Sequence, residues 1–139
     1  MKIYIASPLG FFEAGRVYLY EKLIPRLKAC GYEILDPWTL TDPEYIEAAE
    51  RETDRQKRTD LFRKANAIIG ERNARAIDEC DVVVAILDGT DVDSGTSSEI
   101  GYACAKGKRI EGLRTDFRLA SDNEGSTVNL QVEYFIHLS

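Results

Sequence analysis

The run Val82-Val-Val-Ala-Ile-Leu87 constrains the fold more than any other stretch of the chain. An uninterrupted apolar run rich in Val and Ile is typical of a strand that is buried on both faces of a parallel sheet. A turn rich in Asp, Gly and hydroxyl residues follows at 88–95, and a helical segment then extends to Gly107. A buried strand, a flexible turn and a helix N-terminus form the arrangement at which open α/β sheets bind ligands. The stretch therefore predicts both the fold class and the place of a functional site.

Hydrophobic periodicity elsewhere supports the same fold class. Short β-rich segments at 2–6, 33–36 and 109–113 predict three more strands, and helical spacing predicts helices at 13–30, 59–79, 96–107 and 127–137. Pro25 lies inside the first of these helices, where a kink or an earlier break is expected. A strand, a helix and a second strand early in the chain imply a parallel pair with a right-handed crossover. We predict an α/β fold with a doubly wound parallel sheet of four to five strands and helices on both faces.

Segment 38–58 differs from the rest of the chain. It mixes acidic residues with arginines and contains few large apolar residues. Such a segment can be helical, but we interpret it as a solvated excursion or lid rather than as part of the core. No linker or repeat interrupts the pattern, so we expect residues 1–139 to form a single domain.

Composition excludes several classes of function. The chain of 139 residues has a net charge of −6, which leaves no basic stripe for a nucleic acid. No apolar run approaches the length of a membrane span, and MKIYIASP predicts a strand rather than a signal peptide, so we expect a cytoplasmic protein. Three widely spaced cysteines and a single histidine, His137, predict neither a metal site nor a histidine-centred triad. Walker and G-x-G-x-x-G patterns are missing, so no cofactor is expected.

Glu99 admits two interpretations. Thr96-Ser-Ser-Glu99 fits a capping box, in which Thr96 caps the helix and Glu99 binds the backbone of the first turn. Alternatively, Glu99 is a carboxylate nucleophile or acid–base group, and the positive end of the helix dipole keeps it ionised. Asp88, Asp91 and Asp93 match a calcium loop poorly, so we interpret them as a solvated or ligand-binding turn.

Asn73 interrupts the apolar stripe of the helix at 59–79. It lies four residues after Ile69 and four before Ile77, so its side chain is expected to point inward. A buried amide costs about 1–3 kcal/mol unless it is hydrogen-bonded. Asn73 therefore either caps a nearby backbone group or faces the same crevice as the acidic turn.

The loops after the first, third and fourth strands should meet at the carboxyl edge of the sheet. They bring together Ser7 to Phe11, Asp88 to Glu99, and Arg114 to Arg118. A crevice lined by carboxylates and amides, with few cations, suits a neutral polyhydroxylated molecule such as a sugar or nucleoside. It does not suit a phosphate, which requires a glycine-rich nest, a lysine or free helix N-terminal amides.

The chain resembles the nucleoside 2-deoxyribosyltransferase family along nearly its whole length. The resemblance is carried by Lys2-Ile-Tyr-Ile-Ala-Ser-Pro8, by Asp91-Val-Asp-Ser-Gly-Thr-Ser-Ser-Glu-Ile-Gly-Tyr-Ala103, by Arg114-Thr-Asp-Phe-Arg118 and by Asn129-Leu-Gln131. It implies a flavodoxin-like fold and cleavage of the N-glycosidic bond of a 2'-deoxynucleoside. A glutamate attacks C1' to give a covalent deoxyribosyl-enzyme, and a second free nucleobase captures the sugar with retained configuration, a reaction of nucleotide salvage.

The resemblance also implies roles for single residues. Glu99 matches the nucleophile, and Tyr4 matches a tyrosine that orients it. Asp93 matches an aspartate that holds the sugar 5'-hydroxyl, and Asn129 matches an asparagine that reaches this hydroxyl from a neighbouring subunit, which implies a homo-oligomer. Asn73 stands where relatives have an aspartate that handles the proton of the base. We also expect substrate contacts from four residues of the turn and the first loop, namely Ser7, Phe11, Asp88 and Gly95. The resemblance further implies that residues near Phe11 and segment 38–58 line the base.

Two other functions compete with transfer. One is hydrolysis of a nucleoside or of a 2'-deoxynucleoside 5'-monophosphate, although a carboxylate at Asp93 would repel a 5'-phosphate. The other is nucleoside binding without catalysis, which the amide at Asn73 makes conceivable because an amide cannot donate a full proton at neutral pH.

Overall fold

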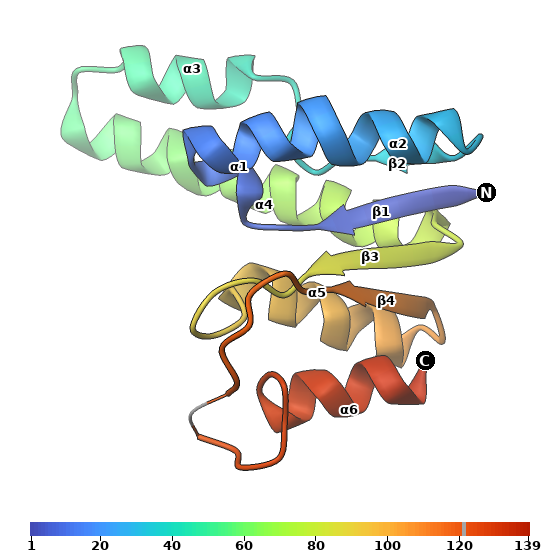
Figure 1. Ribbon diagram of the computed structural model, residues 1–139. Coiled ribbons are helices and arrows are strands. Elements are labelled where there is room, and N and C mark those ends of the chain that lie inside the picture. The colour runs from blue at the N-terminus through green and yellow to red at the C-terminus, as the bar shows by residue number, and fades with distance from the viewer. Residues whose placement is uncertain (121) are drawn as a thin grey trace.

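The computed structural model describes residues 1–120 and 122–139. It contains one sheet of four parallel strands in the order β2-β1-β3-β4, with their bounds at Lys2–Ala6 (β1), Glu33–Leu35 (β2), Val82–Ile86 (β3) and Arg109–Leu113 (β4). Figure 1 shows the strands pointing toward the same edge, with both chain termini at the opposite edge. The predicted doubly wound α/β fold is confirmed, and the order of the strands changes direction between β1 and β3, where such sheets bind ligands.

Helices cover the two faces of the sheet and form two cores. On one face, α4 (Arg55–Glu79), α5 (Ser94–Ala105) and α6 (Leu130–Leu138) pack over Tyr4, Val83 and Ala85. On the other face, the helical segment before β2 packs over Ile3 and Ile5. Alternate residues of β1 therefore face opposite cores, as the pleat of a strand requires. This alternation turns the Tyr4 side chain toward α5.

The first helical segment is continuous through Pro25. It consists of α1 (Glu13–Tyr18), the π-helical turn η2 (Leu19–Leu23) and α2 (Ile24–Ala29), and the short helix η1 (Leu9–Phe11) precedes it, separated by the extended residue Phe12. Within η2 the Ile24 amide donates to the Leu19 carbonyl, five residues earlier. Pro25 cannot donate a backbone hydrogen bond, and the wider turn just before it accommodates this loss. The expected kink is thus replaced by a π turn, which carries Tyr20.

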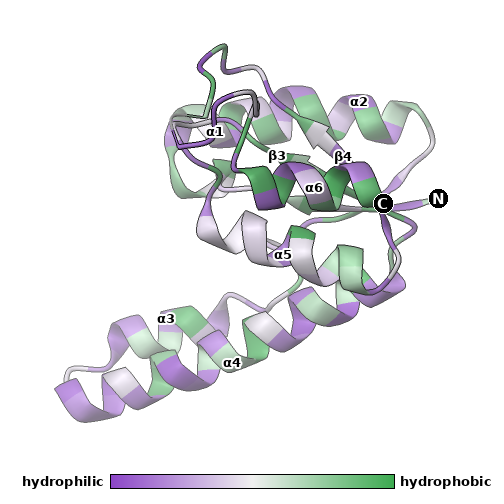
Figure 2. Ribbon diagram, turned by 90° about the horizontal axis from the view of Figure 1, so that it is seen from below, coloured by the Kyte–Doolittle hydropathy of each residue, from purple (hydrophilic) through white to green (hydrophobic). Residues whose placement is uncertain are grey.

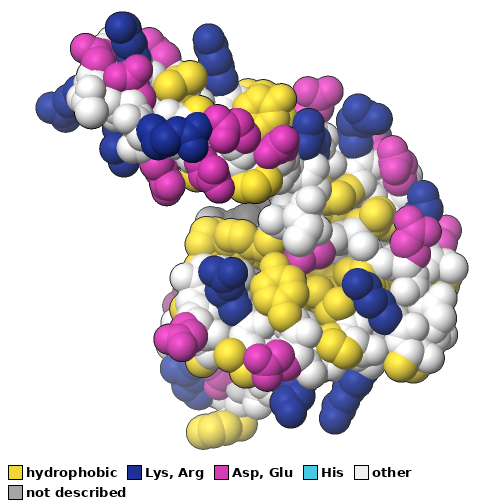
Figure 3. Space-filling model, turned by 90° about the horizontal axis from the view of Figure 1, so that it is seen from above, with side chains coloured by type: hydrophobic (Ala, Val, Ile, Leu, Met, Phe, Trp, Pro, Cys, Tyr) yellow, Lys and Arg dark blue, Asp and Glu magenta, His cyan; other side chains and the backbone are white. Residues whose placement is uncertain are grey.

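Segment 38–58 is mostly helical. α3 (Glu44–Arg51) packs against α4, which begins at Arg55 rather than near residue 59 because Asp54 accepts a hydrogen bond from the Lys57 amide. Arg51 pairs with Glu44 and Glu47, and Ala49 is fully buried. Figure 2 shows α3 and the first half of α4 projecting beyond the α/β body as an arm, and the space-filling view in Figure 3 shows a hollow between this arm and the body. Most of the segment lies outside the two cores, as expected, but Leu40 packs against the core beneath α4 and α5.

Within residues 1–120 and 122–139, no helix combines the length and hydrophobicity needed to cross a bilayer.

Candidate active site

Tyr4 and Glu99 form the centre of the candidate site. The Tyr4 hydroxyl donates a hydrogen bond of 2.6 Å to Oε1 of Glu99, joining the middle of β1 to the second turn of α5. Tyr4 is fully buried and Glu99 is largely buried, so the pair lies beneath the carboxyl edge of the sheet rather than on its surface. Two residues separated by 95 positions in the chain are thus brought into direct contact, as the predicted site requires.

Burial raises the pKa of the Glu99 carboxyl from its ordinary value of 4.5 to about 7. The hydrogen bond from Tyr4 opposes this rise because it stabilises the charged form, and the nearby charge of Asp93 adds to it. The helix dipole is expected to keep Glu99 ionised, but the net shift of its pKa is upward because burial outweighs the effects that favour the charged form. α5 begins at Ser94, so Glu99 lies beyond the first turn, where the dipole acts most strongly, and desolvation dominates.

Asp93, not Thr96, caps α5. Its Oδ2 accepts a hydrogen bond of 3.0 Å from the Thr96 amide, and Glu99 bonds Tyr4 instead of the helix backbone. The capping-box interpretation of Glu99 is therefore wrong, because the N-cap is Asp93, three residues before Thr96. A Cβ at Gly95 would lie 3.0 Å from Asp93 Oδ2, so the missing side chain leaves room for this carboxylate.

Asn73 lies on α4 with a buried Oδ1. Among the residues that the structure describes, this oxygen has no hydrogen-bond partner. The inward orientation predicted from the stripe is confirmed. The alternative prediction, that Asn73 caps a nearby backbone group, is not supported for Oδ1, which accepts no hydrogen bond from the described backbone. An unpaired buried acceptor costs about 1–3 kcal/mol, which a donor on a ligand would recover.

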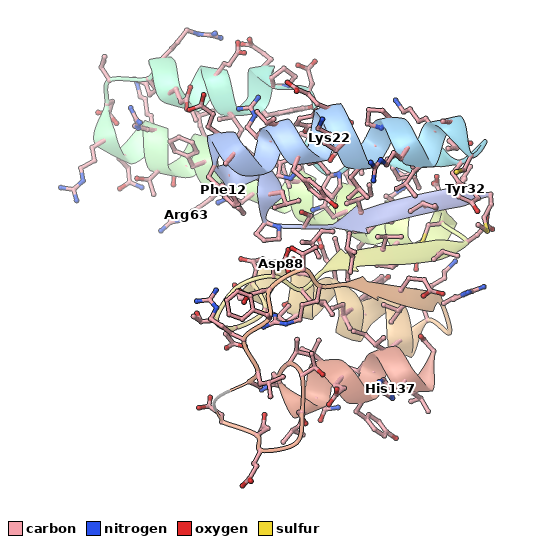
Figure 4. All side chains as sticks on the ribbon, viewed as in Figure 1. Phe12, Lys22, Tyr32, Arg63, Asp88 and His137 are labelled. Atoms are coloured by element: carbon pink, nitrogen blue, oxygen red, sulfur yellow. The ribbon has the colours of Figure 1, made fainter. Side chains whose placement is uncertain are left out.

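Asp88 joins two loops at the carboxyl edge. Its Oδ1 accepts from the amides of Thr115 and Asp116 at 2.5 and 2.7 Å, and its Oδ2 accepts from the Thr115 hydroxyl at 2.7 Å. Burial alone would raise the pKa of Asp88, but these hydrogen bonds and Arg114 outweigh it and lower the pKa. Figure 4 shows Asp88 at the carboxyl edge, whereas His137 lies away from it on α6. The predicted meeting of the loops after β3 and β4 is confirmed.

The other predicted substrate contacts lie around this edge. Ser7 Oγ accepts a hydrogen bond of 3.0 Å from the Leu9 amide, and the Phe11 side chain is 73% exposed. Asn129 caps α6 by accepting from the Gln131 amide at 2.9 Å. It also borders a small hollow beside Thr90, in the acidic turn. Their contacts with a substrate remain predictions.

Sequence reasoning did not single out Asp36, and it included Trp38 only as the first residue of segment 38–58. Both residues follow β2 at the same edge. Asp36 is 4% exposed, and Trp38 packs edge to face against Phe11 with ring centroids 4.6 Å apart. A signal was present, because Asp36-Pro-Trp38 contains the only tryptophan of the chain and directly follows a strand.

Comparisons with known proteins identify the family and the fold. The chain matches the family model of nucleoside 2-deoxyribosyltransferase over residues 3–131. A conserved protein from Enterococcus faecalis V583 superposes with a TM-score of 0.66 at 25% identity, covering 100% of this chain and 87% of that one. A 2-desoxiribosyltransferase from Leishmania mexicana gives a TM-score of 0.66 at 24% identity, covering 94% of this chain and 84% of that one, a likeness of fold.

A curated relative, the uncharacterized protein C191.05c of Schizosaccharomyces pombe, is 27% identical over 121 residues. The match covers 84% of this chain and 51% of the relative, so the chain spans about half the length of that protein. The family match extends from β1, which carries Tyr4, through Glu99 to the first turn of α6. On this match, the chain belongs to the nucleoside 2-deoxyribosyltransferase family.

Proposed function

We propose that the protein transfers 2-deoxyribose between nucleobases through a covalent intermediate on Glu99. The observation that carries the proposal is the hydrogen bond of 2.6 Å from the Tyr4 hydroxyl to the largely buried Glu99 carboxylate. A buried carboxylate with one oxygen held by a tyrosine leaves the other oxygen free to approach an electrophilic carbon. The donor would be a 2'-deoxynucleoside and the acceptor a free nucleobase.

In the first step, the ionised Glu99 carboxylate attacks C1' from the face opposite the base. The C1'–O bond forms while the C1'–N bond breaks, and its electron pair leaves with the base. The transition state resembles an oxocarbenium ion, which a nearby carboxylate stabilises by its charge. In the second step, a ring nitrogen of another base attacks C1' and loses its proton to water, the new C1'–N bond forms as the C1'–O bond breaks, and Glu99 departs as a carboxylate. Because each step inverts the configuration at C1', the product retains the configuration of the donor.

Asp93 and Asn129 are proposed to hold the 5'-hydroxyl of the sugar. Asp93 is separated from Glu99 by less than two turns of α5, and its carboxylate is partly exposed at the helix N-terminus. A 5'-phosphate beside this carboxylate would be repelled, which favours nucleosides over nucleotides. Asn129 would act from a neighbouring subunit of a homo-oligomer.

Asn73 is proposed to bind the base rather than to protonate it. Its unpaired Oδ1 would accept a hydrogen bond from an N–H of the base edge. The departing base then takes its proton from water or from Asp91, and not from Asp88, because the lowered pKa of Asp88 keeps that carboxylate ionised. A cytoplasmic role in nucleotide salvage is the physiological setting that we propose.

The test is product analysis by chromatography. The protein is incubated with deoxyinosine or thymidine, with and without adenine, and in parallel with the corresponding 5'-monophosphates. Formation of deoxyadenosine supports transfer, whereas release of free base that does not depend on the acceptor supports hydrolysis. No turnover of any of these compounds would refute both catalytic functions and leave nucleoside binding. Glu99→Gln should abolish turnover while it preserves the fold.

A further inference from the structure

The segment after β2, residues 36–40, is held by hydrogen bonds at both ends. At its start, Asp36 Oδ2 accepts a hydrogen bond of 3.0 Å from the Tyr20 hydroxyl, and Oδ1 accepts one of 3.2 Å from the Trp38 amide. At its end, Arg72 Nη1 donates at 2.9 Å to the Leu40 carbonyl. Arg72 directly precedes Asn73 in α4. The segment therefore runs from Tyr20 on one face of the sheet to the neighbourhood of Asn73 on the other, along the edge that carries the proposed site.

Asp36 is the fixed point of this segment. Its side chain is 4% exposed, and its backbone carbonyl accepts from both the Thr39 amide and the Thr39 hydroxyl, at 2.9 and 3.0 Å. Tyr20 reaches the carboxylate from η2, the π turn that precedes Pro25. Burial and Glu99 raise the pKa of the Tyr4 hydroxyl most, and the charge of Asp36 adds to that rise, so Asp36 lies within electrostatic range of the proposed centre.

Trp38 is held in one position by this arrangement. Its backbone is bound by Asp36, and its indole lies on Gly10, where a Cβ would come within 2.1 Å of the ring. The ring of Phe11 meets the indole at an interplanar angle of 88°. Despite this packing, Trp38 is 40% exposed and Phe11 is 73% exposed. Each of these two exposed rings at the ligand-binding edge of a parallel sheet offers an apolar face of the kind on which a nucleobase stacks, and because the rings are perpendicular, a base stacked on one would meet the other at its edge.

We propose that Asp36 is a positioning residue for the nucleobase: with Tyr20, it fixes Trp38 against Phe11 and so preforms the aromatic surface on which the base stacks. The proposal rests on the proposed function for the identity of the ligand as a nucleobase. A preformed surface binds with less loss of side-chain entropy than one that must be ordered by the ligand. Asp36 therefore acts on base affinity and not on the chemistry at C1'.

Trp38 supplies a readout that does not depend on turnover, because it is the only tryptophan. Its fluorescence, excited where the bases do not absorb, is recorded while adenine, hypoxanthine, cytosine or thymine is added to the intact protein. We expect saturable quenching by at least one base. Asp36→Ala should raise the Kd of that base about tenfold, as loss of a charge-assisted hydrogen bond predicts. Asp36→Asn should raise it only about threefold, because its amide oxygen still accepts from the Trp38 amide.

Two further variants change the other residues that hold Asp36 and Trp38 in place. Tyr20→Phe removes the hydroxyl but keeps the ring, and should also raise the Kd about threefold. Gly10→Ala places a methyl group in the position of the indole and should raise the Kd without touching Asp36. The matched controls are Tyr18→Phe, at an exposed tyrosine two residues before Tyr20, and Gly70→Ala, where a Cβ would meet nothing within 4 Å. Both controls should leave the Kd unchanged.

The outcomes separate this inference from the proposed function. If deoxyribosyl transfer is observed, KM for the acceptor base should rise in parallel with the Kd while kcat changes little. Turnover without any change of Trp38 fluorescence would overturn the inference and leave the function intact. Saturable quenching without turnover would support the inference and refute transfer. If the Asp36 and Tyr20 variants lose stability in urea but keep the Kd of the wild type, Asp36 is only structural and the inference fails.

Discussion

The raised pKa of Glu99 makes the stability of the protein depend on pH in a way that one substitution should remove. The rise from 4.5 to about 7 means that the folded protein binds the Glu99 proton more tightly than the unfolded chain does. The stability that the protonated Glu99 contributes to the folded protein is fully present below about pH 4.5, and it is lost as the pH rises through about 7. Glu99→Gln cannot ionise, so it keeps the neutral state at every pH.

The size of the effect follows from the two pKa values. Linkage at 1.36 kcal/mol per pH unit gives a destabilisation of the wild type, relative to Glu99→Gln, of about 1 kcal/mol near pH 5.5 and about 3 kcal/mol near pH 8. The difference between these two conditions, about 2 kcal/mol, is the quantity to measure. Any constant cost of the glutamine amide next to Tyr4 cancels in that difference.

Urea unfolding of both proteins at the two pH values measures this difference. A slope of about 1–3 kcal/mol per molar urea converts it into a shift of the unfolding midpoint of roughly 1 M or more. Glu21→Gln, at an exposed carboxylate of η2, controls for the general effect of removing a negative charge. If the stability gap between wild type and Glu99→Gln were the same at both pH values, the desolvation of Glu99 inferred from the structure would be refuted.

Three further predictions concern activity and the helix cap. Tyr4→Phe removes the hydrogen bond that lowers the pKa of Glu99, so the acidic limb of the pH profile of kcat/KM, expected near 7 in the wild type, should move upward; an unchanged midpoint would contradict this. Asp93→Ala should cost about 1 kcal/mol of stability, because it removes the cap on the Thr96 amide, whereas Asp93→Asn should keep the cap and weaken the rejection of 5'-phosphates. Chemical denaturation and the ratio of kcat/KM for nucleoside and nucleotide measure these effects. Asn73→Asp should retain or raise transfer activity in the chromatographic assay, and complete loss would assign the amide a role of its own.

The local pattern was sufficient for the four strands and the main helices, but it misplaced the first residues of α4, α5 and α6 and did not assign α3. Four strands, the α/β class and the inward-facing Asn73 follow from periodicity, because burial on one or both faces leaves a direct trace in the order of apolar residues. The start of α5 does not follow from such a trace. Asp93 and Thr96 are both good caps, and only the path of the preceding turn decides that Asp93 is used.

The sequence by itself determined the strand, the acidic turn and the residue types that the site contains, because these are properties of neighbouring positions. Only the tertiary structure decided what Glu99 bonds and how strongly it holds its proton. The hydroxyl that it meets lies on β1, and the desolvation that raises its pKa comes from packing between segments far apart in the chain. The contact between Asp36 and Tyr20 could not be predicted from the sequence for the same reason. A carboxylate at the end of a short strand has no recognisable pattern until the π turn brings a hydroxyl to within 3.0 Å of it.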